Sequence, residues 1–138
     1  MKNKVEVRWT NEMAFEATVG EHKLILDAAL ESGGKERGPR PKPLTLVALG
    51  GCTGMDVISI LKKMQVFPDD FRLEIEGELT EEHPKVYHTI NLHYIFKGKN
   101  LPMEKLEKAV TLSREKYCGV SAMMGKAAKI EHTITVEP

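Results

Sequence analysis

The sequence lacks a charge imbalance and any basic block. Among its 138 residues, 20 are Lys or Arg and 20 are Asp or Glu, so the net charge is zero. Proteins that bind nucleic acid typically carry a basic patch, because contacts to phosphates supply much of their affinity. The composition therefore predicts no nucleic-acid partner, and the length is that of one ordinary domain.

Cysteine is scarce, and only Cys52 and Cys118 are present. No CxxC pair and no cluster of cysteine and histidine at metal-ligand spacing occurs, so the spacing predicts no metal site. A chain of this length can bury a core without disulfides or metals. The two thiols are therefore either small buried side chains, as most lone cysteines are, or candidates for chemistry.

Signals for a leader, a membrane span and a phosphate-binding loop are also missing. The start, MKNKVEVRW, has no apolar signal core, so we expect a cytoplasmic protein with reduced thiols. The longest apolar segment, 44–64, is interrupted at Asp56, short of the roughly 18 apolar residues of a membrane span. The run GGCTG lies inside this segment rather than between a strand and a helix, so no phosphate site is expected.

What is present is a central helix, predicted over 44–66, whose apolar residues cover nearly all faces. Such a helix is typically buried. Gly50 and Gly51 each cost about 1 kcal/mol relative to alanine inside a helix. Two explanations remain open: another backbone packs closely against the glycines, or reactants must reach Cys52.

The other segments predict an α+β fold in a single domain with mostly antiparallel sheets. Residues 1–30 alternate in polarity as a β-meander, and 31–43 form a loop rich in glycine and proline. The segment 67–138 predicts the order ββααβ, with a helix over 102–117 and a short helix over 122–126.

A reactive Cys52 would need a stabilised thiolate. Asp56, one helical turn later, disfavours the thiolate, and the helix dipole is weak two turns into the helix. The nearest cations outside the helix are Arg37 and Arg40, although loop arginines are usually solvated. Cys118 has Arg114 four residues before it.

Two motifs resemble those of the OsmC/Ohr family of organic hydroperoxide resistance proteins. The run GPRPKPLTLVALGGCTGMDVISILKKM is similar to the family's central helix. Its phrase LxxLGGCxGxDVxSIL most resembles a YhfA-like branch. The later YCGVSAMM…KI resembles the second cysteine motif, and the resemblance spans nearly the whole chain.

The resemblance implies an OsmC-like fold in an intertwined homodimer, with each active site at the subunit interface. It implies a thiol peroxidase for small organic hydroperoxides, used in oxidative-stress defence. Cys52 would be the peroxidatic cysteine and Cys118 the resolving one. An external dithiol, such as a lipoylated protein, would restore the thiols, and no cofactor is expected.

One departure from the family pattern concerns the glutamate that precedes the central helix and holds an arginine. Here the approach reads PKPL, so Lys42 or Pro43 occupies the acidic position. Glu36 could replace that carboxylate, and Arg40 is preferred over Arg37 as the activating cation. The alternative hypothesis is a non-catalytic OsmC-like dimer that binds an apolar ligand or handles sulfur.

Overall fold

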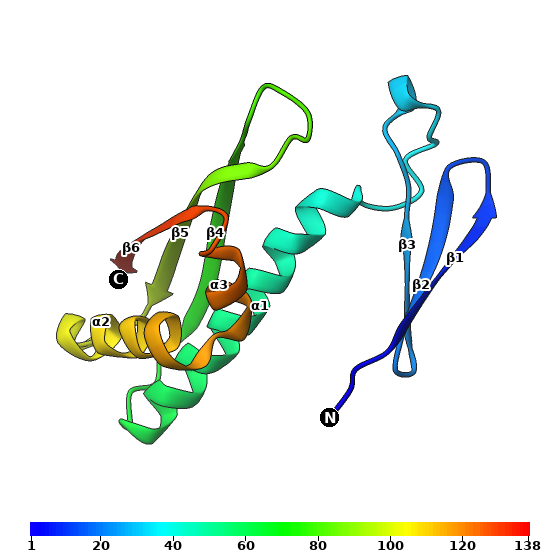
Figure 1. Ribbon diagram of the computed structural model, residues 1–138. Helices are drawn as coiled ribbons and strands as arrows, with labels where there is room; N and C mark the ends of the chain where they lie inside the picture. Colours follow the sequence, from blue (N-terminus) through cyan, green and yellow to red (C-terminus); the bar gives the residue numbers. More distant parts are fainter. The chain divides into compact units, whose positions relative to one another are not determined.

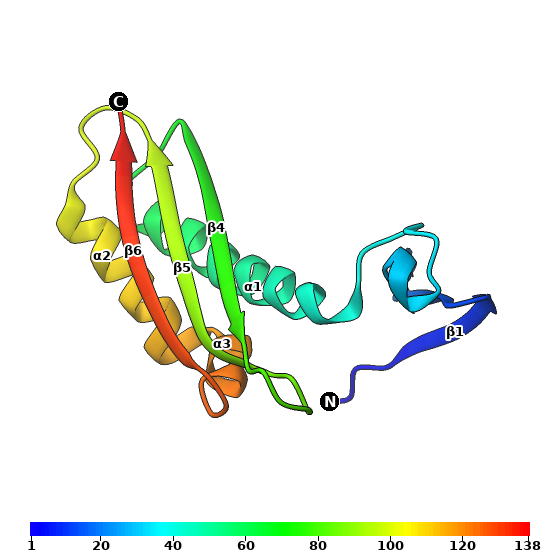
Figure 2. The same ribbon diagram turned by 90° about the horizontal axis from the view of Figure 1, so that it is seen from above.

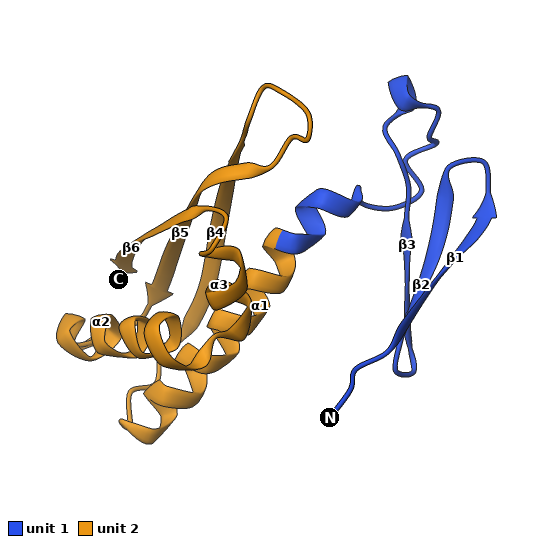
Figure 3. Cartoon of the chain, viewed as in Figure 1, with its two compact units in different colours: residues 1–45 blue, residues 46–138 orange.

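The chain forms two compact units. The computed structural model describes residues 1–138, and the units comprise residues 1–45 and 46–138 (Figure 3). The helix α1, Pro41–Lys63, contributes its first residues to the first unit and the remainder to the second. Each unit contains its own three-stranded sheet.

The first unit is an antiparallel meander of β1 (Val5–Asn11), β2 (Ala14–Val19) and β3 (His22–Leu26) (Figure 1). A register shift between Trp9 and Asn11 interrupts the β1–β2 ladder. The alternation of apolar and polar residues predicts half-buried strands; β2 buries Ala14 and Ala17, whereas every residue of β1 is exposed in the single chain. A short 3₁₀ turn, Leu30–Ser32, follows the meander.

The buried carboxylate of Asp27 organises the loop that follows. It accepts hydrogen bonds from the backbone N–H groups of Ala28 at 2.7 Å, Lys35 at 3.1 Å and Arg37 at 3.2 Å. A Cβ atom at Gly38 would lie 2.0 Å from the carbonyl oxygen of Ile25, so only glycine fits there. These contacts give the glycine-rich segment one defined path.

The second unit contains β4 (Asp70–Leu79), β5 (Tyr87–Lys97) and β6 (Lys129–Glu137). β4 and β5 pair antiparallel, whereas β5 and β6 pair parallel. The parallel pairing requires a crossover, which α2 (Met103–Leu112) and α3 (Gly119–Met124) provide. Figure 2 shows α1, α2 and α3 against one face of this sheet. The predicted α+β class with mostly antiparallel pairing is confirmed.

Both boundaries of α1 differ from the sequence prediction. α1 begins at Pro41 rather than 44, because the first turn of a helix tolerates the missing N–H of proline. It ends at Lys63 rather than 66, and Gln65 then adopts a left-handed φ of 60°. The predicted loop 31–43 is correspondingly shorter.

The segment predicted as one helix over 102–117 is divided in the structure. α2 ends at Leu112 and passes into a π-helical turn, Ser113–Tyr117. The short helix α3 starts at Gly119 rather than 122, because the sulfur of Cys118 accepts the Ser121 N–H and caps it. These changes place Cys118 at a helix start.

One stripe of α1 is buried, whereas the sequence predicts burial on nearly all sides. The stripe consists of Leu49, Thr53, Val57 and Leu61. It packs in a core with β5 and α2, whose largest members include Tyr94, Phe96 and Leu106. Val47 and Met55 remain 66% and 77% exposed. The helix α1 is long and apolar enough to cross a membrane, judged by length and composition only. The core helix of a soluble protein meets the same criterion.

Candidate active site

The second unit brings the two cysteines together. The sulfur atoms of Cys52 and Cys118 and a carboxylate oxygen of Asp56 all lie within 4.8 Å of one another. Both thiols are free. Cys52 and Asp56 share one face of α1, since residues four apart stack along a helix.

Local hydrogen bonds hold Cys118 in place. Its side chain is 2% exposed, and its sulfur accepts the Ser121 N–H at 3.3 Å. The Ser121 hydroxyl donates to the Cys118 carbonyl oxygen at 3.0 Å. The turn before it is closed by the Cys118 N–H, which donates to the Ser113 carbonyl at 2.7 Å. The sulfur of Cys118 is thereby positioned by backbone structure.

A chain of hydroxyl groups leads from the core to Asp56. Ser113 donates to Asp56 Oδ2 at 2.9 Å, Ser113 and Thr53 are 2.9 Å apart, and Thr53 and Tyr94 are 2.7 Å apart. Because each hydroxyl has a single proton, Ser113 accepts from Thr53, and Thr53 accepts from Tyr94. The donated protons thus point toward the carboxylate, and all three hydroxyl residues are fully buried.

The surroundings of Cys52 favour the neutral thiol. Burial raises the pKa of Cys52, and the neighbouring Cys118 and Asp56 raise it further, while the N–H of Val120 lowers it. Burial also raises the pKa of Tyr94, which keeps its hydroxyl protonated as a donor. Within this unit, the neighbouring side chains of Cys118 and Asp56 therefore do not activate Cys52 as a nucleophile.

The other predicted site residues lie in the first unit and have partners there. Arg37 pairs with Glu12 at 2.6 Å. Arg40 pairs with Glu36 at 2.8 Å, and both side chains are exposed. That Glu36 replaces the family's carboxylate stays a prediction. The action of either arginine on Cys52 stays a prediction.

The sequence alone did not identify the hydroxyl chain. Thr53 offered a weak signal, because a hydroxyl inside a buried helix needs a hydrogen-bond partner. Nothing in the sequence marks Tyr94 or Ser113 as that partner. The sequence analysis related Asp56 to Cys52 along one helix, and the resemblance paired Cys52 with Cys118, but neither predicted that all three side chains form one cluster, because Cys118 comes from a separate element.

The profile of OsmC-like proteins matches residues 33–133 of the chain. The chain belongs to the OsmC-like family. This OsmC-like protein is 37% identical over 135 residues to Protein YhfA of Escherichia coli K12, covering 96% of this chain and 97% of YhfA. The resemblance predicted from the two cysteine motifs is confirmed.

Solved structures share the fold of this OsmC-like protein. A protein from Aquifex aeolicus VF5 has a TM-score of 0.84 and 33% identity. The match covers 100% of this chain and 99% of the Aquifex chain. The organic hydroperoxide resistance protein OsmC of Legionella pneumophila has a TM-score of 0.73 and 18% identity. The match covers 98% of this chain and 97% of the Legionella chain. At that lower identity the likeness concerns the fold alone.

Proposed function

We propose that this protein is a cysteine-based peroxidase that reduces organic hydroperoxides in oxidative-stress defence. The observation that carries the proposal is the approach of the Cys52 and Cys118 sulfur atoms to within 4.8 Å. Two free thiols at this separation can cycle between a dithiol and a disulfide. The shared fold with an organic hydroperoxide resistance protein supports the choice of substrate class.

The reaction has two steps. The Cys52 thiolate attacks the outer oxygen of R–O–O–H, the O–O bond breaks, Cys52 becomes a sulfenic acid, and the alkoxide takes a proton to leave as ROH. The Cys118 thiolate then attacks the Cys52 sulfur, and a disulfide forms as hydroxide leaves and becomes water. An external dithiol, such as a lipoylated protein, reduces the disulfide.

The same proposal includes a homodimer in the cytoplasm. In the single chain α1 exposes apolar side chains, among them Val47, Met55 and Ile58. Exposed apolar residues in a contiguous patch typically mark an interface. A reducing compartment would keep both cysteines as thiols between catalytic cycles.

The test is consumption of cumene hydroperoxide by the full chain with a dithiol reductant. We expect turnover that Cys52→Ser abolishes. Cys118→Ser should still consume about one equivalent in a first burst, because only resolution is lost. Consumption that is absent, or unchanged by Cys52→Ser, would refute the peroxidase.

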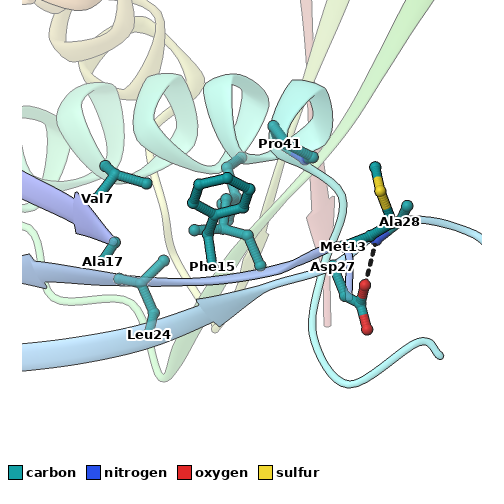
Figure 4. Close-up of a pocket in the computed structure, with 10 residues that line it drawn as sticks. Val7, Met13, Phe15, Ala17, Leu24, Asp27, Ala28 and Pro41 are labelled. Atoms are coloured by element: carbon teal, nitrogen blue, oxygen red, sulfur yellow. Dashed lines mark hydrogen bonds between the residues drawn. The ribbon is translucent and has the colours of Figure 1, made fainter. Parts of the chain in front are cut away.

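A second candidate function is binding of an apolar ligand without catalysis. Two observations favour it: the surroundings of Cys52 raise its pKa, and the first unit contains an apolar pocket of about 540 Å³. Figure 4 shows side chains from its strands that line the pocket, including Val7, Phe15, Ala17 and Leu24. Native mass spectrometry that finds a retained ligand on protein with unreactive thiols would favour this function.

A further inference from the structure

The cluster of Cys52, Asp56 and Cys118 has a donor set suited to a metal ion. One atom of each side chain can act as a ligand, and these three atoms lie within 4.8 Å of one another. Two of the donors come from one face of α1, and the third caps α3. Rigid elements therefore present all three donors to a common point.

The donor types select a class of metal. Two thiolates and one carboxylate suit a thiophilic divalent cation such as Zn²⁺, whereas Ca²⁺ and Mg²⁺ prefer oxygen ligands throughout. Tetrahedral zinc places sulfur ligands about 3.8 Å apart and sulfur and oxygen ligands about 3.6 Å apart, given its bond lengths. The observed separations of up to 4.8 Å need to close by only about an ångström.

Neighbouring groups support the ligands as outer-sphere partners do in metal sites. Ser113 donates to Asp56 Oδ2 at 2.9 Å, which leaves the other carboxylate oxygen for a metal. The N–H group of Ser121 donates to the sulfur of Cys118 at 3.3 Å. Such partners orient ligands and tune their donor strength.

The carboxylate of Asp56 is not paired with a basic side chain. None of the ion pairs in the chain involves Asp56. A metal ion would replace the protons of the two thiols as it binds. Its two positive charges would then compensate the negative charges of the thiolates and the carboxylate that hold it.

We propose that the reduced Cys52–Asp56–Cys118 cluster binds one thiophilic divalent cation, of which Zn²⁺ is the type, with a fourth position left for water. The proposal does not depend on the peroxidase. Metal and disulfide exclude each other, since both use the same two sulfur atoms. Zn²⁺ would thus hold the dithiol in a protected, non-oxidised form.

The test is an anaerobic titration of the reduced full chain with Co²⁺, followed by competition with Zn²⁺. We expect one Co²⁺ per chain, with sulfur-to-cobalt charge-transfer absorption and the strong visible bands of four-coordinate cobalt. Added Zn²⁺ should abolish both the charge-transfer absorption and the visible cobalt bands. Chain oxidised to the Cys52–Cys118 disulfide should show neither, and absence of charge-transfer absorption in the reduced chain would overturn the proposal.

Single substitutions separate this site from adventitious binding by surface histidines. Cys52→Ser and Cys118→Ser should each reduce the charge-transfer intensity by about half, since thiolates are the ligands that produce it. Asp56→Asn should keep that absorption and weaken Zn²⁺ affinity by roughly 10- to 100-fold. The matched control Glu107→Gln, whose carboxylate pairs with His132 at 3.0 Å, should change neither.

Two outcomes would count against the site, and each is independent of peroxidase activity. Zn²⁺ affinity that survives the double substitution of both cysteines by serine would assign the metal to other residues. Affinity unchanged in Asp56→Asn would remove the carboxylate from the ligand set. Circular dichroism of each variant confirms that it is folded. A chain without hydroperoxide turnover could still bind Co²⁺ through thiolates, so the two proposals fail separately.

Discussion

The hydroxyl of Ser113 donates a hydrogen bond to Asp56 Oδ2 at 2.9 Å. This bond joins the π-helical turn before Cys118 to the helix that carries Cys52. The same hydroxyl accepts from Thr53, which accepts from Tyr94 in β5. The relative position of the two cysteines therefore depends on a buried polar chain as well as on apolar packing.

The hydroxyl chain should contribute measurably to stability. Thr53→Val leaves the buried hydroxyl of Tyr94 without a partner and removes the bond that Ser113 accepts, so we expect it to lower the free energy of unfolding by about 1–3 kcal/mol. Tyr94→Phe removes one end of the chain and should cost less, about 1 kcal/mol. Urea denaturation of both variants measures the difference. Equal costs would mean that Thr53 is not the central link.

Asp56 should lower the rate at which Cys52 reacts with alkylating agents. Burial raises the pKa of Cys52 most, and Cys118 and Asp56 add to the effect. Asp56→Asn keeps the shape and an acceptor for Ser113, but removes the negative charge. We therefore expect a lower apparent pKa and faster iodoacetamide alkylation of Cys52 at neutral pH, scored by mass spectrometry. Slower alkylation would show that the carboxylate acts as a base instead.

The raised pKa of Cys52 also predicts how its environment affects stability with pH. A folded-state pKa above the ordinary 9.0 means that folding favours the neutral thiol. That contribution is fully present below pH 9.0 and is lost as the pH rises through the folded value. Urea midpoints should therefore fall more steeply above pH 9 in the wild type than in Cys52→Ser, where the group does not titrate.

Oxidation should link Cys52 to Cys118 within one chain. Their sulfur atoms already lie within 4.8 Å, so a disulfide requires only local movement. Peptide mapping after treatment with one equivalent of hydroperoxide should recover that pair. A disulfide between chains, or sulfinic acid at Cys52 with Cys118 free, would contradict the resolving role.

Arg40 is predicted to activate Cys52. A guanidinium stays charged at any working pH and donates several hydrogen bonds, which suits a thiolate and a peroxide oxygen. Arg40→Ala should raise the apparent pKa of Cys52 alkylation, and Arg37→Ala should have a smaller effect. Arg8→Ala is the control, because Arg8 pairs with Glu6 on an exposed strand at 3.2 Å. If neither loop variant differs from the control, the cation comes from elsewhere.

The apolar residues that α1 exposes predict a dimer. Met55 is 77% exposed, and Val47 is 66% exposed on the same helix. We expect sedimentation velocity to show a dimer at micromolar concentration, and Met55→Glu to shift it to monomer by placing a charge in the interface. Thr133→Glu, on the exposed side of β6, should leave the dimer intact. A monomeric wild type would contradict the prediction.

The sequence by itself determined the elements and the family. Alternation of polarity marked the strands of the meander, and the all-round apolar segment marked α1, since both follow from periods of local backbone geometry. The two cysteine motifs indicated the OsmC-like family. Boundaries were less certain, because the sulfur cap of Cys118 and the π-helical turn depend on contacts made after the chain has folded.

Only the tertiary structure decided which side chains meet at the site. Cys118 reaches Cys52 because the crossover between β5 and β6 returns the chain to the face of the sheet that α1 covers. Ser113 lies in the same crossover and reaches Thr53 in the same way, whereas Tyr94 reaches Thr53 from β5, against which α1 packs. Sequence spacing describes neighbours within one helix or strand, whereas packing between elements joins residues whose separation along the chain carries no signal.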